Sequence, residues 1–333
     1  MTSYRDAGVD IDEGNRAVTL MRDAVASTVT PPVLSELGAF GGLFAADELG
    51  PGKVLVASTD GVGTKVDLAA RHGGWAGVGA DLVNHCIDDI LVQGARPLFF
   101  LDYIATAHLV PEVVAEIVSG MAEACRAAGC ALLGGETAEM PGVYQPGAVD
   151  IAGTIVGVVD RDALWPRTEE LTAGDLLVGF ASSGPHTNGY SLIRRLLDDH
   201  TPPAGMIDAL LVPHRSYLAD VDRLLEAGVE PKALAHITGG GFHENVPRVL
   251  PPALGARFEL GSWVGPDLFR MLVEWGDLPD DEAFRVWNMG IGLVAAVDVA
   301  AAPTIEQLGL PIIGELVEVP DDGSRVELAG GWR

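Results

Sequence analysis

Lysine is nearly absent from the 333-residue sequence, which contains it at three positions only, Lys53, Lys65 and Lys232. In total, 21 basic residues stand against 47 acidic ones, for a net charge of −26. No stripe of lysine and arginine appears along the chain. Nucleic acids and anionic membranes are bound through such clusters, so the composition excludes both as partners. To bind a phosphate ligand, the protein would need a metal ion or one of its few basic residues to offset the negative electrostatic potential at the site.

Long apolar runs and a cysteine framework are absent too. No apolar stretch approaches the ~18–20 residues needed to span a bilayer. Residues 1–15 are polar and acidic, unlike a signal peptide, and we therefore expect a cytoplasmic protein. Cys86, Cys125 and Cys130 form neither a CxxC pair nor a zinc-site spacing. This pattern predicts buried, reduced thiols.

Strand and helix patterns alternate in the first half of the chain, and the length favours two domains. Apolar residues recur at helical spacing in residues 75–93, and a proline in the first turn is typical of a helix at 111–128. Strands are predicted at residues 54–59, 97–105, 131–133 and 150–159. A charged, turn-rich stretch at 160–175 then separates the halves, which predicts domains at residues 1–165 and 170–333.

The second half repeats this alternation. Strands are predicted at residues 176–181, 233–237 and 291–297. Helices are predicted at residues 190–198, at 214–227 and around 267–275, and a final helix–strand pair ends near residue 319. The sequence therefore predicts a mixed α/β fold with two α/β domains.

A glycine-rich segment follows the first predicted strand. Asp60, Gly61, Gly63, Thr64 and Lys65 lie in the sequence Asp-Gly-Val-Gly-Thr-Lys. Glycines on a loop after a strand let a ligand approach the backbone, and the lysine supplies a rare positive charge. Neither GxxxxGK[ST] nor GxGxxG is present, so the glycines alone indicate a turn as readily as a phosphate site. A carboxylate beside a lysine favours a site for a metal ion and a nucleotide.

Acidic residues lie on the helix predicted next. Asp81, Asn84 and Asp88 are three and four residues apart and share one face. A solvated acidic stripe is the alternative interpretation. However, Asp88 and Asp89 lie in an otherwise apolar segment, where paired carboxylates are costly unless a cation neutralises them. Magnesium, held through a few carboxylates, water and substrate phosphates, fits these ligands.

A further acidic residue, Glu136, comes after the strand predicted at 131–133 and two glycines. Its carboxylate can bind a metal ion or act as a base, and an exposed turn is the alternative. We hypothesise that Asp60, Asp88 and Glu136 converge on one metal site.

A polar loop joins the first strand of the second half to a helix and contains Ser183, Gly184, His186, Thr187 and Asn188. Hydroxyl and backbone N–H groups before a helix N-terminus form an anion site. An ordinary capped loop is the alternative, but a cap needs no imidazole, which makes His186 distinctive.

Three consecutive glycines, which include Gly240 and Gly241, follow a later strand in a matching loop. For the neighbouring His243, a structural role is as plausible as a functional one. His108, His200 and His214 have no companions in the sequence, which favours surface or core roles.

Taken together, these segments resemble the phosphoribosylformylglycinamidine cyclo-ligase family, also called aminoimidazole ribonucleotide synthetases. The resemblance starts at residues 4–12 and includes residues 60–65. It continues at residues 79–83, 92–103, 134–142, 182–192, 238–245 and 288–292. The motifs are collinear and cover nearly the whole chain.

Four members of the same superfamily fit less well. The sequence lacks the reactive N-terminal cysteine of selenophosphate synthetase and the terminal cysteine of the hydrogenase-maturation member. Thiamine-phosphate kinase lacks the motifs at 134–142 and 183–191, and formylglycinamidine ribonucleotide synthetase would be much longer. A catalytically silent nucleotide-binding regulator is disfavoured, because both ligand loops keep their polar residues.

The resemblance implies an enzyme of purine biosynthesis that uses ATP and Mg²⁺ to close the imidazole ring of formylglycinamidine ribonucleotide. It also implies a homodimer in which the N-terminal domains join strands into a shared barrel. Metal binding is expected from Asp60, Asp88 and Glu136, and catalysis from Lys65, Glu136 and His186. The other expected ligand contacts are Gly61, Gly63, Thr64 and Asp89 for the nucleotide, and Ser183, Gly184, Thr187, Asn188, Gly240 and Gly241 for the substrate.

One segment departs from the family. Members commonly carry lysine or arginine before a glycine-rich stretch near the N-terminus, a mobile segment that closes over ATP. Residues 27–41 lack the basic residues, and Ser35 and Glu36 replace two glycines.

Overall fold

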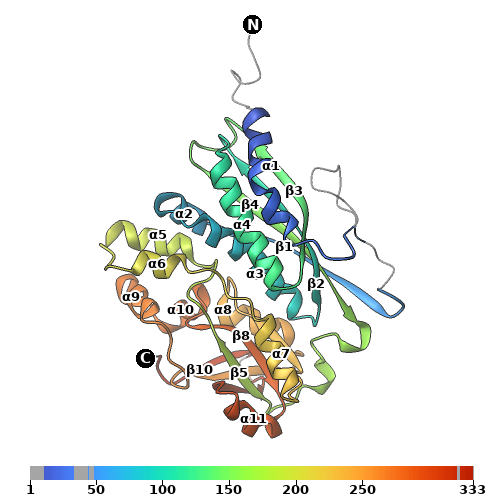
Figure 1. Cartoon of the computed structure of the whole chain (residues 1–333). Coiled ribbons are helices and arrows are strands. Elements are labelled where there is room, and N and C mark those ends of the chain that lie inside the picture. Colours follow the sequence, from blue (N-terminus) through green and yellow to red (C-terminus); the bar gives the residue numbers. More distant parts are fainter. Residues whose placement is uncertain (1–10, 34–43, 45–48, 321–322, 333) are drawn as a thin grey trace. The chain divides into compact units, whose positions relative to one another are not determined.

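The computed structural model describes residues 11–33, 44, 49–320 and 323–332 (Figure 1). The chain divides into an N-terminal unit, residues 1–90 and 95–162, and a C-terminal unit, residues 91–94 and 163–333. Each contains helices and strands, which confirms the mixed α/β prediction. The departing segment at 27–41 falls partly, and the family motif at 4–12 almost wholly, outside the described residues. No helix in the described ranges has both the length and the apolar character to cross a membrane.

The N-terminal unit is built on one sheet, which can be followed in Figure 1. In chain order, its described elements are α1 (Ile11–Ala26), β1 (Lys53–Gly61), α2 (Lys65–His72), α3 (Trp75–Leu91), β2 (Arg96–Thr106), α4 (Pro111–Ala127), β3 (Ala131–Glu139) and β4 (Val149–Asp160). Among these residues the sheet has four strands in the order β1-β4-β2-β3. Strands β2 and β3 are parallel, and the other two pairings are antiparallel.

Strand β4 shows which side of this sheet the helices cover. Buried and half-buried residues alternate along it, as expected when successive side chains point to opposite faces. A Cβ added at Gly157 would lie 2.5 Å from Cδ1 of Ile90 on α3, so the buried side faces this helix. Part of β1 is open to solvent within the described residues, since Leu55 is 58% exposed.

Helices α3 and α4 cross at two glycines. A Cβ at Gly79 would lie 1.9 Å from the carbonyl oxygen of Ile117, and one at Gly120 would lie 1.8 Å from that of Ala76. No side chain fits at such distances, so both positions require glycine. This close crossing fixes α3, which carries several of the predicted acidic residues.

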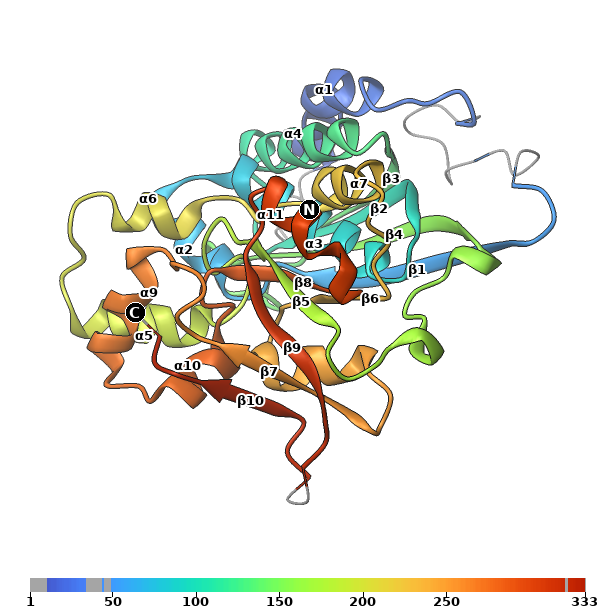
Figure 2. The same cartoon turned by 90° about the horizontal axis from the view of Figure 1, so that it is seen from below.

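The C-terminal unit contains a larger sheet, in which Figure 2 shows β10 at the outer edge beside β7. Its described strands are β5 (Leu176–Ala181), β6 (Ala233–His236), β7 (Leu254–Glu259), β8 (Ile291–Val297), β9 (Ile312–Glu318) and β10 (Val326–Ala329). They lie in the order β10-β7-β9-β5-β8-β6. The α-helices described here are α5 (Tyr190–Asp199), α6 (Met206–Leu211), α7 (Leu218–Glu226), α8 (Gly241–Asn245), α9 (Asp267–Gly276), α10 (Asp280–Val286) and α11 (Ala302–Gln307).

The core of this unit centres on β8, which is buried at every position. An uninterrupted apolar run is typical of a strand covered on both faces. Val178 of β5, Leu224 of α7 and Ile305 of α11 belong to the same buried cluster as Leu293 of β8.

Several predicted boundaries were wrong. Asp60 and Gly61 are the last residues of β1 rather than part of a loop, because they pair with Gly153 and Ala152 of β4. Strand β3 extends through Glu136 to Glu139, since its pairing with β2 continues past the two glycines. The helix predicted at 214–227 begins at Leu218, which leaves His214 in the preceding loop.

Candidate functional site

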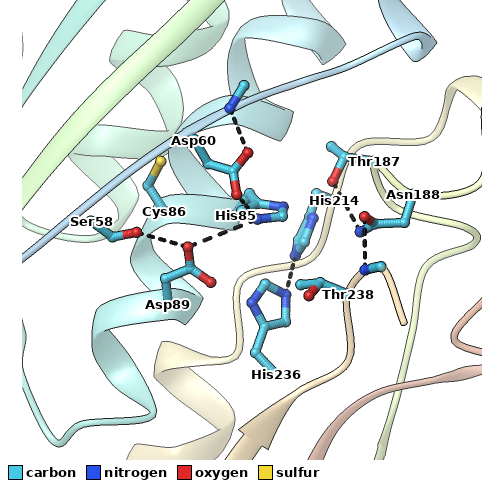
Figure 3. A network of polar contacts seen from close by, with 12 residues as sticks. Ser58, Asp60, His85, Cys86, Asp89, Thr187, Asn188, His214, His236 and Thr238 are labelled. Atoms are coloured by element: carbon cyan, nitrogen blue, oxygen red, sulfur yellow. Dashed lines mark hydrogen bonds and ion pairs between the residues drawn. The ribbon is translucent and has the colours of Figure 1, made fainter. Parts of the chain in front are cut away.

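Two aspartates and a histidine come together in the N-terminal unit, and we call Asp60, His85 and Asp89 the aspartate–histidine cluster. Nε2 of His85 lies 2.9 Å from Oδ2 of Asp60 and 3.9 Å from Oδ2 of Asp89. The hydroxyl of Ser58 donates a 2.9 Å hydrogen bond to Asp89 Oδ2, and the backbone N–H of Gly61 donates to Asp60 Oδ1 (Figure 3).

Regular elements set this geometry. Ser58 and Asp60 are two residues apart on β1 and therefore project to the same side of the strand. His85 and Asp89 are four apart on α3 and share one helix face. Asp60 and Asp89 were predicted from the sequence, whereas His85 was not. The spacing between His85 and Asp89 is the signal that points to it.

Opposing effects act on the ionisation of this cluster. Burial alone would lower the pKa of His85, but the hydrogen bond that its Nε2–H donates to Asp60 and the charges of Asp89, Asp60 and Asp81 outweigh burial and raise that pKa. Burial alone would raise the pKa of Asp60, but the hydrogen bond and charge of His85, with the N–H of Gly61, lower it. Each shift favours the charged form of its group, so His85 and Asp60 stabilise each other's charge.

Lys65 is placed away from solvent. Its Nζ lies 2.9 Å from both carboxylate oxygens of Asp81, and both side chains are 0% exposed. It begins α2, directly after Gly63, which has a φ of 63°, and Thr64, which precedes the helix as its cap residue. The solvated acidic stripe, the alternative interpretation for α3, is wrong, because Asp81 and Asp88 are both fully buried.

Glu136 does not lie with Asp60 in this unit. Strand β3, which carries Glu136, forms the opposite edge of the sheet from β1. Three strand spacings separate these edges, about 14 Å along the sheet. Asp60 therefore lies close to Asp89 and His85 and far from Glu136 of the same chain. A metal or base role for Glu136 stays a prediction.

Two loops meet in the C-terminal unit, and we call residues 182–189 and 238–245 the two-loop centre. The backbone N–H of Gly239 donates a 3.0 Å hydrogen bond to Oδ1 of Asn188 (Figure 3). Asn245 donates from Nδ2 to the carbonyls of Thr238, Gly239 and Gly241. The side chain of Asn188 thus joins the two segments, and that of Asn245 braces the second segment internally.

The first loop is fixed by another asparagine that the sequence analysis did not single out. Asn288 donates a 2.8 Å hydrogen bond to the carbonyl of Gly184 and accepts one of 2.9 Å from the hydroxyl of Ser182. It lies in the family motif at residues 288–292, which was the available signal. Ser183 donates from Oγ to the carbonyl of Pro213.

His186 has a left-handed backbone conformation, with a φ of 61°, which is uncommon for a residue other than glycine. Its Nε2 accepts a hydrogen bond from the backbone N–H of Ser183 at 3.3 Å. A neutral His186 ring therefore carries its proton on Nδ1. The ring stacks on His214 at 3.9 Å between centroids, and His214 lies 3.2 Å, Nε2 to Nε2, from His236. A surface or a core role was expected for His214, and its burial places it in the core.

Gly240 and Gly241 are required by the shape of the second loop, where they have φ values of 88° and 57°. A Cβ at Gly241 would lie 1.8 Å from the carbonyl oxygen of Phe284. Their backbone conformation explains the glycines, and contact with a substrate is a further role that stays a prediction.

Comparison with known proteins identifies the class first. Residues 41–159 match the model of "AIR synthase related protein, N-terminal domain", and residues 172–327 match that of its C-terminal domain. A solved structure, "Hydrogenase Maturation Protein HypE in complex with ATP", is 18% identical with a TM-score of 0.68 and covers 96% of this chain and 92% of its own.

Closer relatives give the particular family. A phosphoribosylformylglycinamidine cyclo-ligase of Geobacillus kaustophilus (strain HTA426) is 49% identical over 99% of both chains. One of Alkaliphilus metalliredigens (strain QYMF) is 46% identical over 95% of both. The chain belongs to the phosphoribosylformylglycinamidine cyclo-ligase family.

Proposed function

We propose that the protein converts formylglycinamidine ribonucleotide and ATP into 5-aminoimidazole ribonucleotide, ADP and phosphate. The observation that carries this proposal is the 49% identity to a cyclo-ligase over 99% of both chains. Both domain models match as well, and the ATP bound by the HypE neighbour supports nucleotide use.

The reaction needs a better leaving group than the formyl oxygen. Transfer of the γ-phosphoryl group to that oxygen forms an O–P bond and releases ADP. The amidine nitrogen then attacks the same carbon, and the C–O bond breaks as phosphate departs. The protein must stabilise the negative charge of the phosphoryl group during its transfer. It must also hold the substrate with its amidine nitrogen close to the formyl carbon.

We assign the nucleotide to the segment containing Gly61, Gly63 and Thr64, next to the aspartate–histidine cluster. Asp60 and Asp89 fit a divalent cation, since their side chains are 47% and 24% exposed and offer carboxylate oxygens. When bound, Mg²⁺ would neutralise charge on the ATP phosphates. Asp88 lies on the same helix and is fully buried, and its role as a metal ligand stays a prediction.

A direct catalytic role for Lys65 requires its ammonium group to exchange Asp81 for a phosphate. The pair is compatible with this role, because Lys65 begins α2 directly after the glycine-rich segment.

We assign the phosphate of the ribonucleotide to the two-loop centre. The glycines Gly184, Gly240 and Gly241 would let an anion approach the backbone closely, and Ser183, Thr187 and Asn188 add polar atoms. His186, protonated on Nδ1 when neutral, can donate a hydrogen bond or move a proton. Glu136 is proposed as a base on the strength of the family resemblance.

A homodimer is proposed for the same reason. The exposed Leu55 on β1 leaves part of the N-terminal sheet free to join a second copy. Sedimentation of the pure protein tests this, and a monomer mass at all concentrations would contradict it. A cytoplasmic location is likewise proposed, and cell fractionation tests it.

The activity itself is tested with the pure protein, ATP, Mg²⁺ and formylglycinamidine ribonucleotide. We expect equal amounts of ADP and aminoimidazole product. If neither ADP nor the aminoimidazole product is released, the proposal is wrong. Asp60→Asn is expected to lower turnover by about 100-fold or more while the circular dichroism spectrum stays that of the wild type. Unchanged turnover would remove Asp60 from the site.

A further inference from the structure

The aspartate–histidine cluster contains an imidazole, which a site for Mg²⁺ does not need. Magnesium prefers oxygen ligands and retains several waters, whereas imidazole suits transition-metal ions such as Zn²⁺, Fe²⁺ and Ni²⁺. We infer that His85 is a ligand of the divalent ion held by Asp60 and Asp89, and that it makes this site selective for a transition-metal ion over Mg²⁺.

The spacing of the three side chains fits one ion. Nε2 of His85, an oxygen of Asp60 and an oxygen of Asp89 all lie within 4.8 Å of one another. Around an ion with ligand bonds of about 2.1 Å, neighbouring ligand atoms lie about 3.0–3.4 Å apart and opposite ones about 4.2 Å apart. The observed 2.9 Å and 3.9 Å separations from His85 Nε2 therefore need only small side-chain movements.

The carboxylates are also oriented as metal ligands usually are. Asp89 accepts a hydrogen bond from Ser58, and Asp60 accepts one from the backbone N–H of Gly61. Such outer hydrogen bonds hold ligand oxygens in place and raise metal affinity. Asp81, which also faces this region electrostatically, pairs with Lys65 and is not needed as a ligand.

Charge favours a cation at this position. Two carboxylates face one imidazole, and burial of the His85 side chain to 5% exposure makes uncompensated negative charge costly. A bound divalent ion would supply the compensating positive charge. Asp60 is 47% exposed, which provides a route from solvent.

Metal binding can be measured on the full-length protein without nucleotide or substrate. We expect Co²⁺, followed by its visible absorption, to bind about 100-fold more tightly than Mg²⁺, followed by calorimetry. His85→Gln is expected to weaken Co²⁺ binding by about tenfold or more and to change Mg²⁺ binding by less than about twofold. Equal Co²⁺ affinity in His85→Gln and the wild type would overturn the inference.

Two matched variants distinguish loss of the His85 ligand from nonspecific effects of substitution on metal binding. His72→Gln removes an exposed imidazole from the same unit and is expected to leave both affinities unchanged. Asp89→Asn removes an oxygen ligand and is expected to weaken Co²⁺ and Mg²⁺ alike. A loss of Co²⁺ affinity in His72→Gln equal to that in His85→Gln would contradict the assignment.

Spin-echo spectroscopy of bound Mn²⁺ provides a readout that does not depend on folding of the His85 variant. We expect modulation from an imidazole nitrogen in the wild type, retained in Asp89→Asn at saturating metal. Its absence from the wild type would refute ligation by His85. The inference rests on the proposed function only in placing the ion beside the nucleotide. Failure of metal selectivity therefore leaves the turnover test intact, and a failed turnover test leaves the metal measurements intact.

Discussion

The aspartate–histidine cluster and the two-loop centre are built from different chemical groups. In the first, charged side chains stand on β1 and α3, with the buried Lys65–Asp81 pair in the same unit. In the second, neutral amides hold loops whose glycines have left-handed backbone conformations. Charge on rigid elements suits a small cation, which needs fixed ligands. Glycine-rich loops, in contrast, let an anion approach the backbone closely.

The comparison is tested most strongly by removing charge from the interior of the N-terminal unit. Lys65→Met leaves the Asp81 carboxylate buried without its cation, and we expect a loss of about 3–5 kcal/mol in the free energy of unfolding. Urea unfolding followed by circular dichroism measures it. Lys53→Met is the matched control, because Lys53 and Asp160 form a 2.7 Å pair that is 35% and 63% exposed. This control is expected to cost less than about 1 kcal/mol, and equal losses would contradict the ranking.

The two-loop centre depends on backbone shape instead of charge. Gly241→Ala would place a Cβ 1.8 Å from the carbonyl oxygen of Phe284, at a φ of 57°. Strain and displacement together are expected to cost about 3 kcal/mol, measured by the same unfolding assay. Gly261→Ala adds a Cβ with nothing within 4 Å and is expected to change stability by less than about 0.5 kcal/mol. Similar stability of the two variants would show that the loop adapts.

The carboxyl group of Asp102 contrasts with that of Asp60, whose pKa is lowered by His85. Burial raises the pKa of Asp102 to about 7, against about 3.9 in an unfolded chain. The folded state therefore binds the extra proton between these values, and stability falls as pH rises from about 4 to about 7. Because Asp102 is only half-buried, we expect about 2 kcal/mol over this interval, less than the ~4 kcal/mol that a fully buried group would give.

Unfolding of Asp102→Asn at a series of pH values measures this effect. The variant is expected to gain stability relative to the wild type as pH rises from 4 to 7, since its amide does not ionise. Asp150→Asn, at an exposed position of the same sheet, is the control and should keep the wild-type slope. A parallel slope in Asp102→Asn would remove Asp102 as its source.

Local patterns were sufficient for much of the fold. The predicted limits of β5 and β8 agree with the structure, because each is an apolar run between turn residues. Strand β3 was cut short because two glycines and a glutamate are typical of a turn. Its extension depends on pairing with β2, where Gly135 leaves room for Asp102 (a Cβ would lie 2.3 Å from Oδ1). Such strand pairing forms only in the folded sheet, so the sequence of β3 alone does not predict it.

Some residues of the candidate site could likewise be predicted from local sequence patterns, and others could not. Asp60 and Asp89 could be found from residue type and neighbours. His85 was missed, because its four-residue spacing from Asp89 was a weak local signal and its importance depends on contact with Asp60, 25 positions earlier in the sequence. The burial of Asp81 depends on packing of α2 beside α3, which brings Lys65 to it. Sequence patterns identified the acidic residues, but their partners were set by tertiary contacts.

Substitutions of Asn188 are expected to have the smallest effect on stability, and they test the role of the two-loop centre most directly. Its Oδ1 accepts the hydrogen bond from the Gly239 N–H that joins the loops. Asn188→Ala is expected to cost about 1 kcal/mol of stability, and Asn188→Asp should cost less because the acceptor oxygen remains. Unfolding assays measure both.

The two variants are expected to rank in the opposite order in catalysis. A carboxylate at position 188 would repel a bound phosphate, so KM for formylglycinamidine ribonucleotide should rise about tenfold in Asn188→Asp, or about 1.4 kcal/mol, and less in Asn188→Ala. Steady-state kinetics at saturating ATP measures this. If Asn188 only ties the loops together, Asn188→Asp will behave as the wild type in both assays. A normal KM in Asn188→Asp would therefore leave the two-loop centre a structural junction and move the phosphate elsewhere.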